Sequence, residues 1–319
     1  MEKSKKRVLI SGLIVIKAAV IIALVTQSFD SDTNNTNHAY SNEMTYQVKS
    51  FTLPDSFSFA GEKMPLEFFD VRESLDKELL ISAYRHSSTI TLIKKANRFF
   101  PQIEPILAEY GVPDDFKYLA VAESDLANLV SPVGATGFWQ IMEATGKEQG
   151  MEINTEIDER YDLEKSTRFA CKYILKAYEK YGSWTLAAAS YNAGNRGIDE
   201  QVGIQNETDY YNLLLNDETA RYIFRIASYK LIFTSPEAYG ITIPDEDLYP
   251  QIPYTEVKID SAVTSFEQLA KNYGTNYKML KFLNPWLRKP FLTNKNGKSY
   301  TLRVPAQDSR TTQNNSDGE

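Results

Sequence analysis

A helical spacing of apolar residues from Asp70 to Phe233 is the feature that most constrains how this chain can fold. Apolar side chains recur three and four positions apart, which places them on one face of an α-helix. No alternating run typical of a β-strand interrupts this spacing. We therefore predict a mainly α domain here. Its expected helices cover residues 71–84, 90–107 with a kink or restart at Pro101 and Pro105, 113–123, 163–182, 184–192, 208–215 and 219–233.

Polar residues mark several of the expected helix ends. Asp70, Asp162 and Ser183 each precede an apolar stripe, and short oxygen-bearing side chains of this kind accept hydrogen bonds from the first backbone N–H groups of a helix. Gly182 follows the last apolar residue of one stripe and is suited to the left-handed conformation that ends a helix. These signals predict three helix starts and one helix end.

One acidic residue, Glu123, occupies a position where the helical pattern would place an apolar side chain. It follows Phe116, Leu119 and Ala120 by seven, four and three positions, so all four share one helical face. Burial disfavours the charged form of a carboxyl group, and we therefore expect the pKa of Glu123 to be raised. Enzymes keep a general acid protonated near neutral pH in this way, at about 6–7. A helix-end glutamate turned to solvent or held in an ion pair is the competing interpretation.

Three further motifs follow Glu123 along the chain. In the first, two glycines three positions apart permit tight turns and close approach of a ligand to the backbone. Trp139 in this motif can offer a flat face to a sugar ring, and Gln140 can bond hydroxyl or acetamido groups. The motifs are Gly134–Gln140, Tyr191-Asn192-Ala193-Gly194, and Glu218-Thr219 with Tyr222.

In order and spacing, Glu123-Ser124 and these motifs resemble the catalytic domain of family 1 lytic transglycosylases. The likeness is closest to the membrane-bound murein transglycosylase D group, relatives of goose-type lysozyme, and covers residues 107–233. It implies a lysozyme-like helical domain, the SLT domain, in which Glu123 is the single acid and base. The residues that the resemblance implies for glycan binding, or beside the acid, are Ser124, Ser131, Gln140, Tyr191, Asn192, Glu218 and Tyr222. The sequence departs from the family at Glu143, Leu163 and Asn195-Arg196, and the last of these could reshape one groove wall.

The resemblance also implies a reaction on peptidoglycan. Glu123 would protonate the glycosidic oxygen between N-acetylmuramic acid and N-acetylglucosamine. The same carboxylate would then accept the proton of the muramic acid 6-hydroxyl, which closes onto C1 and leaves a 1,6-anhydro end. Ordinary glycosidases need two carboxylates, but Asp125 lies two residues further along the helix and points away from Glu123. No metal or cofactor is expected. The alternatives are a hydrolytic goose-type muramidase and an inactive glycan-binding envelope protein.

A second, smaller unit is expected after residue 235. Residues 236–254 contain four prolines and read as a semi-rigid connector. A strand at 256–260, two helices separated by Gly274, and a strand at 300–305 follow. This order resembles a LysM glycan-binding module. Its most recognisable piece is Leu283-Asn284-Pro285, whereas the usual Gly-Asp-Thr opening is Ser261-Ala262-Val263-Thr264 here. We predict an α+β module over residues 255–306, which either binds glycan or only packs on the catalytic domain of residues 61–235.

The N-terminal segment, residues 1–26, is predicted to be a signal anchor or a cleaved signal peptide. A basic start precedes 18 mainly apolar residues, Val8–Val25, which Lys17 interrupts. No convincing cleavage site follows, and no cysteine allows lipoprotein processing. Residues 27–60 are expected to form a disordered spacer and residues 307–319 a disordered tail. The protein is thus expected in the cell envelope, with a periplasmic domain tethered to the inner membrane or secreted after cleavage.

Composition argues against several other functions. The net charge of −7 without an apparent basic face argues against nucleic-acid partners. Only His38 and His86 are present, and His38 lies in the spacer. A Ser-His-Asp triad, a Cys-His pair or a histidine zinc site would therefore depend on His86 alone. The single cysteine, Cys171, lies on an apolar stripe and is expected to be a buried free thiol. The expected partners are peptidoglycan strands and the membrane.

Overall fold

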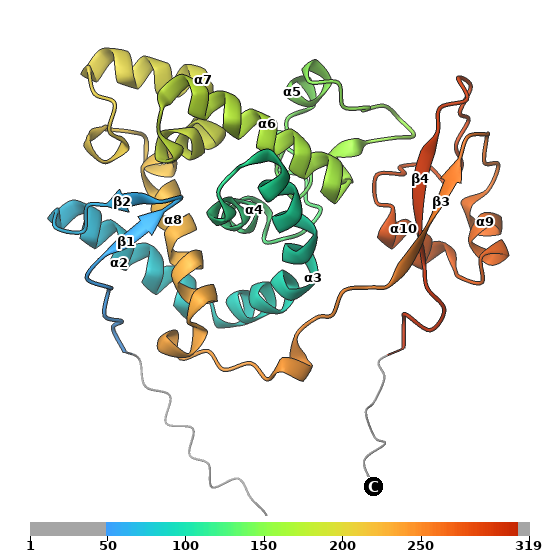
Figure 1. Ribbon diagram of the computed structural model, residues 1–319, viewed down its shortest axis with the longest axis horizontal. Helices are drawn as coiled ribbons and strands as arrows, with labels where there is room; N and C mark the ends of the chain where they lie inside the picture. The colour runs from blue at the N-terminus through green and yellow to red at the C-terminus, as the bar shows by residue number, and fades with distance from the viewer. Residues whose placement is uncertain (1–48, 312–319) are drawn as a thin grey trace, which may run out of the picture. The chain divides into compact units, whose positions relative to one another are not determined.

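The computed structural model describes residues 49–311 of the chain (Figure 1). Helices fill most of residues 69–234, and one two-stranded sheet precedes this region while another follows it. The mainly α fold predicted from the sequence is confirmed. The predicted signal anchor or signal peptide, most of the spacer and residues 312–319 of the tail lie outside the described residues. Within residues 49–311, no helix has the length and apolar character needed to cross a membrane.

The ordered part of the chain starts earlier than the sequence suggests. Strand β1 (Phe57–Phe59) pairs antiparallel with β2 (Glu62–Met64), so the end of the predicted spacer is folded. Leu53 and both phenylalanines of β1 are buried in the main core. The Glu62 carboxylate accepts hydrogen bonds from the first backbone N–H groups of a later helix, at Trp184 and Thr185. The prediction was wrong here because polar neighbours hide two short apolar alternations.

Capping chemistry explains several helix limits in the main domain. The side chains of Asp162 and Ser183 accept hydrogen bonds from Lys165 N and Leu186 N, and Gly182 adopts the left-handed conformation with a φ of 67°. All three predictions are thereby confirmed. The helices are α2 (Phe69–Tyr84), α3 (His86–Tyr110), α4 (Lys117–Ser124), α5 (Glu143–Glu148), α6 (Leu163–Tyr181), α7 (Trp184–Gln205) and α8 (Asp217–Thr234).

The first helices differ in part from their predictions. The residue that caps α2 is Phe68, and Asp70 lies in its first turn, where a negative charge still favours the positive helix end. A kink or a restart was predicted at Pro101 and Pro105, and the restart is excluded because α3 continues through both prolines. Each proline removes a backbone hydrogen bond at a cost of about 3 kcal/mol. The buried face of this 25-residue helix offsets that loss through packing.

The region between α7 and α8 also differs from its prediction. Residues 208–215 form only the short 3-10 helix Tyr210–Asn212. Helix α7 breaks at Gly194, where φ and ψ are 73° and 151°, and then continues to Gln205. The break agrees with the helix end predicted near Asn192. Polar residues in 206–209 support turns instead of a further helix, and Asp209 caps the 3-10 helix through Tyr211 N.

Helix α4 lies inside the domain, between α3 and α8 (Figure 1). Four consecutive residues, Tyr118–Val121, are buried, so neighbours surround α4 on several sides. Helix α8 also packs along α2, where small residues allow close approach and the hydroxyl groups of Ser82 and Ser228 lie 2.8 Å apart. Cys171 on α6 is a buried free thiol, as predicted, and burial raises its pKa to about 12.

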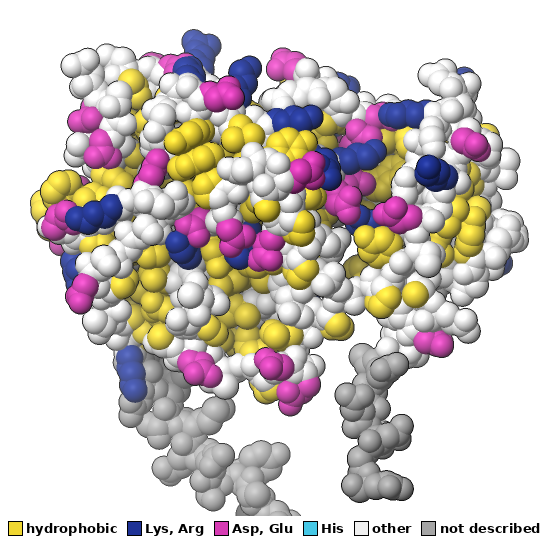
Figure 2. All heavy atoms as spheres, viewed as in Figure 1, with side chains coloured by type: hydrophobic (Ala, Val, Ile, Leu, Met, Phe, Trp, Pro, Cys, Tyr) yellow, Lys and Arg dark blue, Asp and Glu magenta, His cyan; other side chains and the backbone are white. Residues whose placement is uncertain are grey.

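The C-terminal unit has the predicted strand–helix–helix–strand order. Strands β3 (Tyr254–Ile259) and β4 (Tyr300–Pro305) pair antiparallel, and α9 (Phe266–Asn272) and α10 (Tyr277–Leu283) lie between them in the chain. We call residues 255–306 the C-terminal module. The connector before it contains the short 3-10 helices Pro236–Tyr239 and Asp245–Asp247. On the face shown in Figure 2, acidic and basic side chains are interleaved and form no broad patch of one sign.

Candidate active site

Glu123 lies in the last turn of α4, where the chain changes direction sharply. Asp125 and Leu126, which follow the helix, have positive φ angles of 52° and 49°. The Glu123 side chain is partly buried. Burial raises its pKa to about 7, while the hydrogen bond from the Tyr222 hydroxyl to Glu123 Oε1 opposes that rise. The carboxyl group can therefore exist in either protonation state near neutral pH, as a group that must act as both acid and base requires.

One face of α8 supplies the surroundings of this carboxyl group. Glu218, Tyr222 and Arg225 are spaced by four and three positions, so they lie on the same side of the helix. The positive charge of Arg225 lowers the pKa of Glu123, and the negative charge of Glu218 raises it. Sequence analysis missed Arg225. Its spacing from Tyr222 was the signal that could have identified it.

A buried carboxylate on α2 holds the arginines of α8. Glu78 is 2% exposed, and Arg221 Nε donates to its Oε1 over 2.6 Å. Arg225 Nε lies 4.0 Å from the other carboxylate oxygen. Glu78 therefore helps to fix the arginine that acts on Glu123. Sequence analysis missed this residue too, although an acidic residue between Leu75 and Leu79 on an apolar face was a visible signal.

Tyr191 lies close enough to Glu123 for the charge of that carboxyl group to raise its pKa, in addition to the larger effect of burial. Its hydroxyl, however, donates to the backbone oxygen of Trp139 over 2.7 Å. The resemblance implied that Tyr191 lies beside the acid, and the effect of Glu123 on its pKa agrees with that placement. The hydrogen bond to Glu123 comes from Tyr222, whereas Tyr191 supports the backbone of the Gly134–Gln140 motif.

Asn192 links the break in α7 to the start of α8. Its Nδ2 donates to Glu218 Oε1 over 3.3 Å, and its Oδ1 accepts from the Thr219 hydroxyl over 2.9 Å. Asn192 and Glu218 thus lie side by side, and the negative charge of Glu218 raises the pKa of Glu123. The structure brings together Glu123, Tyr191, Asn192, Glu218 and Tyr222 from three helices.

Ser131 and Gln140 belong to the groove loop, our name for residues 129–141. Ser131 Oγ accepts a hydrogen bond from Ala135 N over 3.0 Å. Gln140, whose φ is 45°, donates through Nε2 to Gly137 O over 2.8 Å and to Leu129 O over 3.3 Å. Both side chains are partly exposed and shape the loop from within. The amide oxygen of Gln140 makes no hydrogen bond inside the described part of the chain, and a ligand can approach it.

Two predicted glycan contacts are wrong, because both side chains are buried. Ser124 is 2% exposed, and its hydroxyl donates to Ala120 O. Trp139 is 0% exposed, and its Nε1 donates to the Thr167 hydroxyl over 2.9 Å. Spacing within a turn does not reveal which side faces the core. The exposed apolar side chains on and beside the groove loop are Leu129, Val130, Val133 and Met142.

Asp125 lies near Glu123 in the sequence, and Glu218 is close enough for its negative charge to raise the pKa of Glu123. Asp125 turns away, with its carboxylate 3.6 Å from Arg85. Glu218 is engaged by Asn192. Within residues 49–311 no group of three or more His, Cys, Asp or Glu side chains could hold a metal ion.

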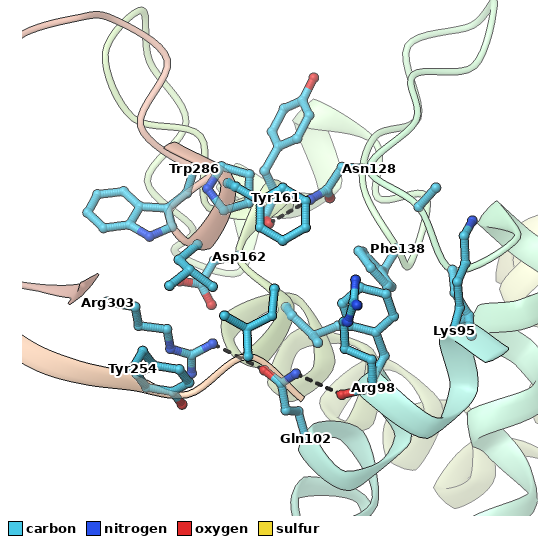
Figure 3. Close-up of a pocket in the computed structure, with 18 of the residues that line it drawn as sticks. Lys95, Arg98, Gln102, Asn128, Phe138, Tyr161, Asp162, Tyr254, Trp286 and Arg303 are labelled. Atoms are coloured by element: carbon cyan, nitrogen blue, oxygen red, sulfur yellow. Dashed lines mark hydrogen bonds between the residues drawn. The ribbon is translucent and has the colours of Figure 1, made fainter. Parts of the chain in front are cut away.

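A separate cavity of about 440 Å³ lies between the helical domain and the C-terminal module (Figure 3). Its lining includes Asp162 and Arg303 but not Glu123. Two of its aromatic rings make cation–π contacts. The Arg98 guanidinium lies 5.4 Å from the ring centre of Tyr249, and that of Arg303 lies 4.7 Å from the ring centre of Tyr254. Residues of both the helical domain and the C-terminal module therefore line this cavity.

Comparison with known proteins agrees with this arrangement. Residues 103–214 match the family described as Transglycosylase SLT domain, and residues 255–308 match the Soluble lytic transglycosylase C-terminal LysM-like domain. The membrane-bound lytic murein transglycosylase D of Escherichia coli (strain K12) is 26% identical over 202 residues, which cover 60% of this chain and 44% of that protein. The protein of the same name from Escherichia coli O6:H1 gives the same values. The chain therefore spans less than half the length of these curated relatives, and the resemblance found in the sequence is confirmed for both units.

Proposed function

We propose that this protein is a peptidoglycan lytic transglycosylase that uses Glu123 as its acid and then as its base. The observation that carries the proposal is a partly buried carboxyl group with a pKa near 7 that accepts a hydrogen bond from the Tyr222 hydroxyl. The SLT match and the similarity to murein transglycosylase D support the same substrate class.

In the first step, protonated Glu123 donates its proton to the glycosidic oxygen between N-acetylmuramic acid and N-acetylglucosamine. The bond from C1 to that oxygen breaks, and N-acetylglucosamine leaves with a hydroxyl group. Glu123 is then a carboxylate. The hydrogen bond from Tyr222 and the charge of Arg225 both favour this charged form, as their effect on its pKa indicates.

In the second step, the Glu123 carboxylate accepts the proton of the muramic acid 6-hydroxyl. The oxygen of that hydroxyl forms a bond to C1 and closes the 1,6-anhydro ring, which restores protonated Glu123. Because the substrate supplies its own nucleophile, no second carboxylate is needed, in contrast to ordinary glycosidases. Asp125 is paired with Arg85, and Glu218 accepts a hydrogen bond from Asn192.

The groove loop, Asn192 and Glu218 are proposed to bind the glycan strand around Glu123. The Gln140 amide oxygen and the Ser131 hydroxyl suit sugar hydroxyl and acetamido groups. Exposed apolar side chains such as Val133, which is 75% exposed, can cover the less polar sugar faces. The cell envelope is the proposed location, because peptidoglycan is there.

Muropeptide analysis tests this function. The chain from Lys49 onward is incubated with purified sacculi, and the released fragments are separated and weighed. We expect anhydro ends, each lighter by one water than a hydrolytic product. Replacement of Glu123 by Gln should lower turnover by a factor on the order of 10² to 10⁴, since an amide cannot transfer the proton. Products with a reducing end, which contain one added water, would indicate a hydrolytic muramidase. No release, together with unchanged turbidity of the sacculi, would indicate an inactive glycan-binding protein.

A further inference from the structure

The hydrophobic core of the C-terminal module contains a residue from the helical domain. Ile157 lies in the loop between α5 and α6, far from the module in the sequence, yet it is 1% exposed and belongs to the module core. We call residues 152–159 the docking hairpin. The module residues that share this core are Phe266, Ala270, Leu280, Trp286, Leu287, Leu292, Tyr300, Leu302 and Val304.

Backbone pairing joins the docking hairpin to the module. Asp158 N donates to Trp286 O over 2.9 Å, and Arg288 N donates to Glu156 O over 2.7 Å. These bonds flank an antiparallel bridge between Ile157 and Leu287. The hairpin is therefore paired with the module as well as packed against it.

Side chains of the docking hairpin add polar contacts to the module. The Glu156 carboxylate accepts from Thr293 N over 2.8 Å and from the Thr293 hydroxyl. The Glu152 carboxylate pairs with Lys298 and accepts from the Tyr300 hydroxyl over 3.1 Å. The hairpin is thus held to the module by the burial of Ile157, by two backbone hydrogen bonds and by two carboxylates. It has little freedom to move independently of the module.

Arg160 connects this hairpin to the groove loop. Its guanidinium group holds the Asp158 carboxylate through two bonds, from Nε over 3.0 Å and from Nη2 over 2.8 Å. Its Nη1 donates to Gly134 O over 3.2 Å and to Ile141 O over 3.3 Å. Both carbonyl groups belong to the groove loop. Arg160 is buried, so these bonds are protected from competing water.

The groove loop also approaches the backbone of Arg160 very closely. A Cβ atom on Gly137 would lie 2.0 Å from Arg160 O, so only glycine fits there. From its other side, the loop is held by the hydrogen bond between the Tyr191 hydroxyl and Trp139 O. The position of the loop is thus fixed between Arg160 and Tyr191.

We propose that the C-terminal module positions the groove loop, through the docking hairpin and Arg160, for glycan binding at the site of Glu123. Arg160 is then a positioning residue that acts on substrate through the loop. This inference rests on the proposed function for its choice of substrate. The C-terminal module then has a structural role in the catalytic domain, which is to hold the groove loop in position.

The most recognisable piece of the LysM resemblance agrees with this role. Asn284 of Leu283-Asn284-Pro285 is 0% exposed, and its amide bonds the backbone at Leu280 O, Arg303 O and Arg303 N. The ring of Trp286 is buried as well and stacks on Tyr300. The described contacts of Asn284 and the stacking of Trp286 on Tyr300 are therefore made to other residues of the module and stabilise its fold.

Two variants and a control test the proposal. Arg160→Lys keeps the charge but loses the planar fork that reaches Asp158 and both carbonyl groups. Ile157→Ala loosens the hairpin in the module core. Glu164→Gln removes a different contact with the module, the ion pair with Arg303, which does not lead to Arg160. We expect the first two variants to raise KM for glycan strands on the order of tenfold, with a smaller change in kcat. Glu164→Gln should leave both near wild type.

A double variant sharpens the test. If the hairpin acts on the loop through Arg160, Ile157→Ala combined with Arg160→Lys should raise KM no further than Arg160→Lys alone. Glu164→Gln combined with Arg160→Lys should show independent effects. Should Ile157→Ala fail to fold, Ile157→Val is used in its place. Equal, additive effects of the two changes, or an unchanged KM in Arg160→Lys, would overturn the proposal.

Hydrogen exchange separates this inference from the proposed function. Backbone amides of residues 129–141 should exchange faster in Arg160→Lys and Ile157→Ala than in wild type, but not in Glu164→Gln. This measurement needs no activity, so it stands even if the sacculi assay gives no product. Faster exchange confined to residues 255–306 in Ile157→Ala would show that the module and the loop are uncoupled.

Discussion

At the residue scale, the raised pKa of Glu123 has a consequence for stability. The folded protein holds the Glu123 proton up to about pH 7, while an unfolded chain releases it near the ordinary value of 4.5. Between these values the folded state binds more protons, so this residue lowers stability as pH rises. Glu123→Gln has no such titration. We therefore expect its melting temperature to gain on wild type from pH 5 to pH 8, as measured by calorimetry. A constant difference across this range would contradict the raised pKa.

The two tyrosines near Glu123 are expected to differ in their kinetic effects. Tyr222 donates to the carboxyl group and lowers its pKa, so Tyr222→Phe should raise that pKa further. Since kcat/KM falls where Glu123 loses its proton, that limb of the pH profile should move to higher pH, with a lower kcat.

Tyr191→Phe is the matched control for that variant, because it removes a hydroxyl that binds Trp139 O instead. We expect it to raise KM and to leave the pH limb in place. A shift of the limb in Tyr191→Phe, or none in Tyr222→Phe, would reverse the roles that the hydrogen bonds assign to these two residues.

At the scale of elements, the groove loop contains a matched pair of glycines. Gly134 and Gly137 have φ angles of 88° and 85°, so alanine is strained at either position. Only at Gly137 does the new Cβ also meet a backbone atom, Arg160 O at 2.0 Å. We expect Gly134→Ala to cost about 1 kcal/mol of unfolding free energy and Gly137→Ala several times more. Urea denaturation measures both, and equal losses would mean that the loop moves away freely.

Sequence reasoning succeeded for helices with clear ends and failed where tertiary contacts decide. Asp162, Ser183 and Gly182 act within their own helices, and their roles were readable from neighbouring residues. The burial of Ser124 and Trp139 depends on which side of a turn faces the core, which no local spacing specifies. The continuation of α3 through two prolines likewise depends on packing against distant helices.

The candidate site shows the same division. Glu123 was identifiable because its carboxyl group interrupts an apolar stripe. The choice of Tyr222 over Tyr191 as its hydrogen-bond donor required α8 and α7 to be placed in space. Arg225 and Glu78 were missed because their importance comes from contact between α2 and α8.

At the scale of the whole molecule, the first 60 residues of the sequence predict a location. Five basic residues lie in or before the apolar stretch Val8–Val25, and no Lys or Arg follows it until Lys49. This asymmetry should keep the N-terminus in the cytoplasm and place the catalytic domain outside it. Fractionation with N-terminal sequencing is expected to find the uncleaved chain in the membrane fraction. A soluble form that starts near Gln27 would contradict the tether, and a cytoplasmic protein would contradict the envelope location.

The burial of Ile157 inside the C-terminal module bears on how the protein comes to maturity. A chain emerges from the ribosome, and is exported, starting from its N-terminus. Ile157 in the docking hairpin can therefore be buried in the module core only after β4, at residues 300–305, has been synthesised. Until then, the support that we propose for the groove loop is missing. In the lytic transglycosylase proposed above, the glycan-binding loop would therefore reach its final position only after residues 300–305 have been made.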